Sequence, residues 1–200
     1  MGNGLMGAIF LSASVPRPDR GTFHEDANPF LIQFAVRELV TLILGRRRLV
    51  WGGHPAITPM VWSVCTDIGV DYSNAVRLYQ SLFFEDVFPT ENAEFKNVFF
   101  TPAIDEDRNA SLAEMRTQML SNDFEAGVFI GGMEGVLEEY HLFHERHPEA
   151  IVIAVSAPGA AARQLAQQLG QDDERIDFSR LFMDRLKISP AEARKALPPE

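Results

Sequence analysis

The chain has 200 residues, a length typical of one domain, and 46% of them are hydrophobic, which is close to the globular average. Its 28 acidic residues outnumber its 18 basic ones, so the formal net charge is -10. This charge excludes general binding to nucleic acid polymers, which begins with phosphate neutralisation by a basic surface, but it leaves room for one small anion in a local pocket. The single cysteine, Cys65, excludes an internal disulfide and is typical of a reducing cytoplasm.

Hydropathy argues against a membrane or exported protein. No stretch approaches the roughly 20 apolar residues of a membrane span, and residues 1–7 lack the positive start of a secretory signal. Gly2 resembles a myristoylation site, but Met6 stands where that motif has Ser or Thr. We therefore expect a soluble cytoplasmic protein.

Short apolar runs typical of strands alternate with segments of helical period. In the first half we expect a strand over 9–15, a helix from Asn28-Pro29 to Gly45, a strand over 49–51, a helix over 57–68, and short strands over 75–79 and 98–100. In the second half we expect a helix from a capping box at 111–114 to residue 120, a strand over 127–130, a helix over 136–146, a strand over 151–155 and a helix ending at 169. The charged tail from 171 is expected to hold a short helix and a loose end.

This alternation of strands and helices predicts the fold class. Repeated strand–helix–strand units require right-handed crossovers, which place a parallel sheet between two layers of helices. The chain has no repeat, no low-complexity linker and no step in composition. We therefore expect one domain, an α/β three-layer sandwich with a mostly parallel central sheet, formed by residues 1–170, with 171–200 as a helical tail of the same domain.

Ligands of such sheets bind beyond the carboxyl ends of the strands, where the chain order reverses. Three loops are predicted to lie there, at 12–15, 52–54 and 131–135. Two of them begin with a double glycine directly after a strand and just before a helix, where backbone N–H groups and the helix dipole favour phosphate. Glycines also suit plain tight turns, and Ser12 and Ser14 either cap a turn or contact a phosphate.

The segment 130–139 resembles the Pro-Gly-Gly-x-Gly-Thr-x-x-Glu signature of the LOG family, the cytokinin-activating phosphoribohydrolases formerly described as lysine decarboxylases. Aligned without gaps from Glu139, Gly132 and Gly135 fall on family glycines, and Arg116 falls on the arginine of the family's Met-His-x-Arg-Lys motif. The resemblance implies a Rossmann-like fold of the wider SLOG superfamily, a nucleotide or NAD-derived ligand, and a homodimer or larger homo-oligomer.

Several positions depart from these motifs. Gly131 replaces the proline, Met133 the second glycine, Val136 the threonine, and Thr117 the lysine that follows the arginine. Valine keeps the shape of threonine but lacks the hydroxyl that would donate to a phosphate. The departures favour a module that binds a nucleotide over an enzyme that cleaves one.

Arg116 and Glu139 are the catalytic candidates if the protein is an enzyme. Cleavage of an N-glycosidic bond develops positive charge on the ribose, which a carboxylate stabilises, and a carboxylate can also position the attacking water. An arginine can clamp a phosphate with two hydrogen bonds. The alternatives are a surface cation beside Met115 and Met119 for Arg116, and a first-turn glutamate stabilised by the helix dipole for Glu139.

The remaining candidate residues come from the three loops. The expected ligand-binding residues are Ser12, Ser14, Gly52, Gly53, His54, Gly131, Gly132, Met133, Glu134, Gly135, Val136 and Glu138. The aromatic pair at 83–84 either covers a base or anchors its loop. No metal or cofactor is expected, because the histidines at 141, 144 and 147 lie towards a helix end.

Three functions stay open at this stage. The first is a sensor or binding domain for a nucleotide or an NAD-derived metabolite. The second is a phosphoribohydrolase-type N-glycosidic hydrolase acting on a nucleoside monophosphate. The third is a structural subunit with a vestigial pocket. The base, the number of phosphates and the oligomeric state do not follow from the sequence.

Overall fold

The structure is a computed structural model that describes residues 7–198. Its centre is a six-stranded sheet in the order β4-β3-β2-β1-β5-β6, and all five strand pairings within the described residues are parallel. The strands are β1 (Ala8–Ser14), β2 (Arg48–Trp51), β3 (Val76–Ser81), β4 (Asn97–Thr101), β5 (Ala126–Gly131) and β6 (Ile151–Val155). The predicted α/β sandwich is confirmed, with a sheet that is entirely rather than mostly parallel.

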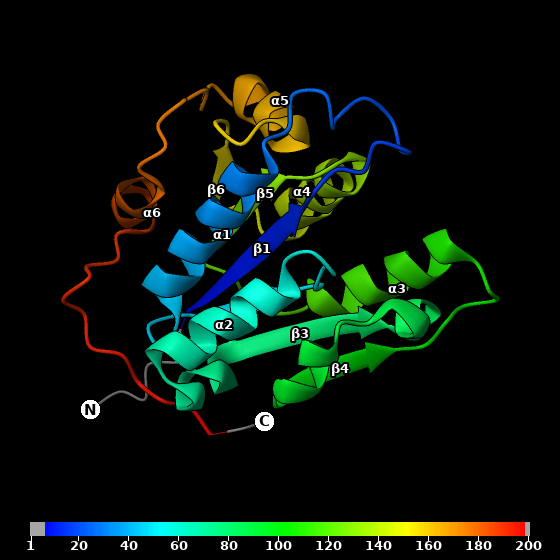
Figure 1. Cartoon of the computed structure of the whole chain (residues 1–200), viewed down its shortest axis with the longest axis horizontal. Helices are drawn as coiled ribbons and strands as arrows, with labels where there is room; N and C mark the ends of the chain where they lie inside the picture. Colours follow the sequence, from blue (N-terminus) through cyan, green and yellow to red (C-terminus); the bar gives the residue numbers. More distant parts are fainter. Residues whose placement is uncertain (1–6, 199–200) are drawn as a thin grey trace.

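Helices cover both faces of the sheet (Figure 1). They are α1 (Pro29–Ile43), α2 (Thr58–Ile68), α3 (Arg108–Met119), α4 (Glu134–Arg146), α5 (Ala160–Gln168) and α6 (Phe178–Leu186), with 3-10 turns η1 (Val70–Ala75), η2 (Leu82–Val87) and η3 (Thr90–Glu94). Side chains alternate between the faces along a strand. Ile9 and Leu11 of β1 therefore pack with α1, α2 and α6, while Phe10 packs with α3, α4 and α5.

The order of the strands fixes where a ligand can bind. From β1 the chain adds β2, β3 and β4 on one side, and then returns to place β5 and β6 on the other side. The order therefore reverses between β1 and β5, whose register pairs Ser14 with Gly131 at their carboxyl ends. In parallel sheets this point leaves a crevice between diverging loops.

Helix α3 begins at Arg108, before the capping box that the sequence predicts. Asp107 is the N-cap residue, and its carboxylate accepts hydrogen bonds from the amides of Asn109 and Ala110 at 2.7 and 2.9 Å. Ser111 lies inside the helix, where its hydroxyl donates to the Asp107 carbonyl at 2.7 Å. The capping box at 111–114 is therefore wrong, because an acceptor four residues upstream already satisfies the first amides.

The C-terminal tail is more ordered than the sequence predicts. Phe178 and Phe182 of α6 are fully buried, and the Phe178 ring meets Phe34 of α1 edge to face at 5.6 Å. Beyond α6 the chain returns to the end of α1, where Arg46 donates to the carbonyl of Glu192 at 2.6 Å. The expected loose end is therefore wrong for the tail as far as residue 198.

Within residues 7–198, none of the helices combines the length and the apolar character that crossing a bilayer requires. Residues 1–6, which carry most of the segment predicted to lack a secretory signal and the Gly2 myristoylation reading, lie outside the described residues.

Replacing the N-cap of α3 tests how this helix starts. We expect Asp107→Ala to lower the free energy of unfolding by about 1 kcal/mol, because two first-turn amides lose their acceptor. Glu114→Ala, which removes the predicted capping-box partner, should change it by less than about 0.5 kcal/mol. Urea unfolding of both variants measures the difference, and a larger loss for Glu114→Ala would contradict the assignment of Asp107 as the cap.

Candidate functional site

A cavity of about 580 Å³ lies beyond the carboxyl ends of β1, β2 and β3, beside the first turn of α4. This volume is within the range of about 300–1,000 Å³ that is typical of small-molecule sites. Eleven of the predicted site residues line it: Ser12, Ser14, Gly52, Gly53, His54, Arg116, Met133, Glu134, Gly135, Val136 and Glu139. Three do not line it: Gly131, Gly132 and Glu138.

The turn from β5 into α4 requires glycine. Gly131 and Gly132 have φ angles of 61° and 79°, in the left-handed region, and a Cβ on Gly132 would lie 2.1 Å from Cγ2 of Val136. The Gly132 amide donates to the carbonyl of Ser14 at 2.8 Å. This amide therefore joins β5 to β1. The two glycines do not line the cavity themselves, but their turn places the first residues of α4 at its wall.

The first turn of α4 is left uncapped. The helix begins at Glu134, two residues before the predicted start, and its N-cap residue Met133 has no side-chain acceptor to offer. Within the described residues, the amides of Glu134 and Gly135 donate to no protein atom. Amides in this position, together with the helix dipole, form an anion-binding end, and both residues line the cavity.

The turn after β2 differs from this arrangement. Gly53 has a φ of 70°. The carbonyl oxygen of the preceding Gly52 accepts a hydrogen bond from the side-chain amide of Gln80 at 2.6 Å. Helix α2 begins only at Thr58, after a further turn. The predicted helix over 57–68 is confirmed to within one residue, but residues 54–57 separate it from the double glycine. Of the two double glycines, the one after β5 therefore leads more directly into a helix.

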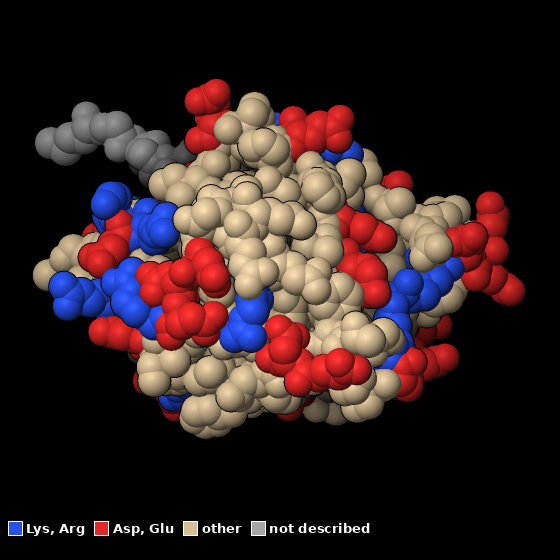
Figure 2. All heavy atoms as spheres, turned by 90° about the horizontal axis from the view of Figure 1, so that it is seen from above, with Lys and Arg blue, Asp and Glu red and all other residues tan. Residues whose placement is uncertain are grey.

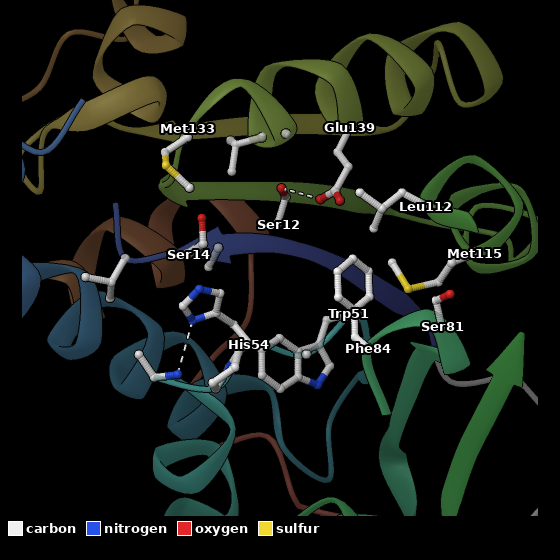
Figure 3. A pocket seen from close by; sticks show the side chains of 18 of the residues that line it. Ser12, Ser14, Trp51, His54, Ser81, Phe84, Leu112, Met115, Met133 and Glu139 are labelled. Carbon is white, nitrogen blue, oxygen red and sulfur yellow. Dashed lines mark hydrogen bonds between the residues drawn. The ribbon is translucent and has the colours of Figure 1, made fainter. Parts of the chain in front are cut away.

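Arg116, Glu139 and Ser12 form one hydrogen-bonded network across three elements. The Arg116 Nε donates to Oε1 of Glu139 at 3.2 Å, and the Ser12 hydroxyl donates to Oε2 of the same carboxylate at 2.6 Å (Figure 3). Arg116 is 8% exposed and Ser12 is 2% exposed. The reading of Arg116 as a surface cation is therefore wrong, and Glu139 is the sixth residue of α4 instead of a first-turn glutamate.

Glu138 completes the surroundings of this arginine. Its carboxylate accepts from Nη1 of Arg116 at 2.6 Å, although the Glu138 side chain is 61% exposed, and Nη2 of Arg116 donates to the Gly135 carbonyl at 3.4 Å. Arg116 is thus occupied by two carboxylates and the first turn of α4. Its role in this structure is to hold Glu139 in place.

His54 is held as a neutral hydrogen-bond donor at the end of β2. Its Nδ1 accepts from the amide of Ala56 at 3.2 Å, so the neutral ring carries its proton on Nε2 (Figure 3). Burial lowers the pKa of His54. A neutral ring with one N–H is suited to a carbonyl or phosphate oxygen, and the residue lines the cavity.

An apolar wall that the sequence analysis largely missed closes the side of the cavity near β2 and β3. In Figure 3 the rings of Trp51 and Phe84 lie across β1 from Met133 and Glu139. Of the aromatic pair at 83–84, Phe84 lines the cavity, whereas Phe83 packs edge to face against it at 5.0 Å. The other apolar lining residues in this region are Val87, Phe88, Pro89, Leu112 and Met115.

The charge of the cavity is opposite to that of the protein. Four arginines (Arg17, Arg20, Arg108, Arg116) and two glutamates (Glu134, Glu139) are among the described residues that line it. The chain as a whole carries -10, and acidic side chains are spread around the face seen in Figure 2. A local positive balance in an acidic chain favours an anionic ligand at this position.

Of these four arginines only Arg116 was predicted; Arg17, Arg20 and Arg108 were not. Arg20 lies in the polar loop after β1, where no pattern distinguishes it. Arg108 is the first residue of α3, where a cation opposes the helix dipole. That conflict is a usable signal, but the misplaced capping box hid it by starting the helix later.

The histidines at 141, 144 and 147 and the single cysteine are not among the described residues that line the cavity. Across 7–198, no cluster of three His, Cys, Asp or Glu residues is arranged to hold a metal ion. Nε2 of His147 lies 3.0 Å from the carbonyl of Leu120, which leaves this nitrogen engaged with protein. Burial raises the pKa of Cys65 to about 12, so the thiol stays protonated at neutral pH.

A parallel sheet between two helical layers, with a cavity at the reversal of strand order, defines a Rossmann-like ligand-binding domain. A family model described as the SLOG cluster3 family matches residues 22–186, and the chain belongs to this family. The match includes Arg116 and Glu139 and begins after Ser12 and Ser14. No curated protein and no solved structure matches the chain. Membership of the SLOG superfamily indicates a nucleotide-related ligand-binding domain.

The lowered pKa of His54 predicts how its contribution to stability varies with pH. Because the folded protein holds His54 less basic than the ordinary value of 6.5, the unfolded chain takes up the proton first as the pH falls. The neutral ring therefore stabilises the fold fully above pH 6.5 and progressively less below it. We expect the difference in unfolding free energy between wild type and His54→Gln to shrink between pH 7.5 and pH 5. Urea titrations at several pH values measure it, and a difference that grows on acidification would contradict the buried neutral ring.

Proposed function

We propose that this protein binds a nucleotide or an NAD-derived nucleotide metabolite in the cavity, as a sensor or ligand-binding domain, with a phosphate on the first turn of α4. The observation that carries the proposal is the uncapped start of α4, where the amides of Glu134 and Gly135 lack protein acceptors at the wall of the cavity. A phosphate oxygen supplies those acceptors and is stabilised by the helix dipole.

The opposite wall suits the base of such a ligand. Phe84 presents an aromatic ring on the side of the cavity away from α4, and planar bases gain stability by packing on aromatic faces. Trp51, which is 1% exposed, supports this wall from the core. Between the two walls, the Nε2–H of His54 and the hydroxyl of Ser14 can donate to the sugar or the phosphate. The apolar end therefore provides burial, and the polar end provides orientation.

Arg116 supports binding more than turnover. Two carboxylates and a carbonyl already occupy its guanidinium, so it is not free to clamp a phosphate, the role that its chemistry suggested in the sequence. Val136 stands where the signature has a hydroxyl, and it lines the cavity without a donor. The phosphate is left to backbone amides and to arginines other than Arg116. Assembly into a homodimer or larger oligomer stays a prediction.

Hydrolysis of an N-glycosidic bond is the second candidate function. It is favoured by one observation: the Glu139 carboxylate lines the cavity and is oriented through both of its oxygens, by Ser12 and Arg116. A carboxylate held in this way keeps lone pairs that can accept from a ribose hydroxyl or from an attacking water. The same geometry serves binding alone.

The hydrolase candidate is tested by following release of free base from nucleoside monophosphates by chromatography. If it is correct, wild type releases base and Glu139→Gln, which keeps the size of the side chain, loses at least about a hundredfold in rate. Equal inactivity of both proteins on the whole panel removes this candidate and leaves the binding proposal standing.

Substitution of Met133 tests the binding proposal directly. Met133→Asp supplies the missing N-cap and should raise the free energy of unfolding by about 1 kcal/mol, while its carboxylate should weaken nucleotide binding by about tenfold or more because it occupies the same amides. Met133→Leu, similar in volume and uncharged, is the matched control and should change both values little.

Calorimetric titration with the mono- and diphosphates of adenosine, guanosine, cytidine and uridine, and with NAD and ADP-ribose, provides the readout for this test. A Met133→Asp variant that folds more stably and still binds as tightly as wild type would remove α4 from the site. Failure of wild type to bind any member of the panel would overturn the proposed function itself.

A further inference from the structure

Arg20 and Arg108 are two further cations that line the cavity. Arg20 reaches it from the loop between β1 and α1, and Arg108 from the first residue of α3. In the part of the chain that the structure describes, neither has a carboxylate oxygen within 4.0 Å, although the protein carries 28 acidic residues. Two cations left without carboxylates at one end of a cavity, in so acidic a chain, indicate a place prepared for an anion.

The other two arginines of the cavity differ from this pair. Arg17 forms a two-point ion pair with Asp19, at 3.0 and 2.8 Å. Arg116 is bound by Glu138 and Glu139. The charges of Arg17 and Arg116 are therefore balanced within the protein, and the unbalanced positive charge of the cavity is concentrated on the pair that remains.

Arg108 lies in an unfavourable electrostatic environment. Partial desolvation lowers the pKa of its guanidinium, and the nearby charges of Arg20 and Arg116 lower it further, while the charge of Glu138 opposes the shift only in part. Its position at the start of α3 adds the positive end of a helix dipole. Each of these costs falls when an anion binds beside the guanidinium, because the anion favours the charged form.

Arg108 is displaced from the first turn of α4, and Arg20 comes from a loop that passes beside that turn. Arg116 contacts that turn through the Gly135 carbonyl, and Arg108 lies eight residues earlier on the same helix, about 12 Å along its axis at 1.5 Å per residue. The loop that carries Arg20 passes beside α4, since a Cβ on Gly21 would lie 3.5 Å from Oε1 of Glu134. The amides of α4 and the two arginines therefore line one cavity, with Arg108 on the side of the start of α3 and the loop of Arg20 beside α4.

We propose that Arg20 and Arg108 form a second anion subsite, so that the ligand carries two phosphate groups, one at the first turn of α4 and one between these two guanidinium groups. The inference rests on the proposed function and narrows it to nucleoside diphosphates and to nucleotides with a diphosphate bridge. Guanidinium groups suit this task because they form paired hydrogen bonds with phosphate oxygens.

The test compares affinities for matched mono- and diphosphates. For the base that binds best among adenosine, guanosine, cytidine and uridine, we expect wild type to bind the diphosphate at least about tenfold more tightly than the monophosphate. In the double variant Arg20→Gln, Arg108→Gln the ratio should fall to about two or less, while the Kd for the monophosphate changes by less than about threefold. ADP-ribose should follow the diphosphate.

Arg37→Gln is the control for net charge. Arg37 pairs with Asp67 on the outer surface of α1 and α2 and does not line the cavity; its replacement should leave the diphosphate preference unchanged. Equal affinity of wild type for mono- and diphosphate overturns the second subsite and leaves the proposed function intact, and so does a double variant that keeps the preference. Absence of binding to all eight nucleotides and to NAD and ADP-ribose overturns both proposals. The wild-type ratio needs no variant, so the test does not depend on how the double variant folds.

Discussion

The hydrogen-bonded network of Ser12, Glu139 and Arg116 is the interaction on which the rest of the site depends. It joins the end of β1, the second turn of α4 and the last turns of α3, and Ser12 and Glu139 are 127 residues apart in the chain. A buried arginine is costly unless carboxylates and carbonyls satisfy it, and here three acceptors do so. The network therefore fixes the distance between α3 and α4 on either side of the reversal in strand order, and the cavity lies above it.

Backbone geometry then directs α4 into this space. Gly131 and Gly132 turn the chain with positive φ angles, and the Gly132 amide is used to join β5 to β1. The first amides of the helix are left facing the cavity with Met133 at the N-cap position, although Ser, Thr, Asp or Asn is preferred there. An unsatisfied helix start is unfavourable for folding and favourable for binding an anion. The net charge of -10 opposes an anionic ligand at long range, so affinity has to come from these short-range donors and the local arginines.

The fold and much of the site were predictable because they depend on local patterns. Apolar runs and glycine turns place the strands and helices, and the motif at 130–139 leads to the correct superfamily. The start of α3 was mispredicted because Ser111 and Glu114 satisfy a capping pattern, whereas the preceding residues Asp105 and Glu106 adopt positive φ angles that deliver Asp107 to the cap instead. No local sequence pattern predicts these positive φ angles at Asp105 and Glu106.

Other features depend on contacts between distant segments, which local sequence patterns do not predict. The tail follows α1 because Phe178 packs against Phe34 and because Arg46 donates a hydrogen bond to the carbonyl of Glu192, 146 residues away. The approach of Arg20 to Arg108 likewise exists only after folding. The role expected for Arg116 also changed: the sequence predicted a cation available to a ligand, whereas in the structure Arg116 forms an ion pair with Glu139.

The central claim is that the uncapped start of α4 holds a phosphate, and backbone amide NMR tests it most directly. A titration of ¹⁵N-labelled protein with the best-binding nucleotide follows each amide separately. Among the loops around the cavity, the account predicts the largest chemical-shift changes for the amides of Glu134 and Gly135, because these amides gain a hydrogen-bond acceptor. Binding that shifts other amides and leaves these two unchanged would contradict it.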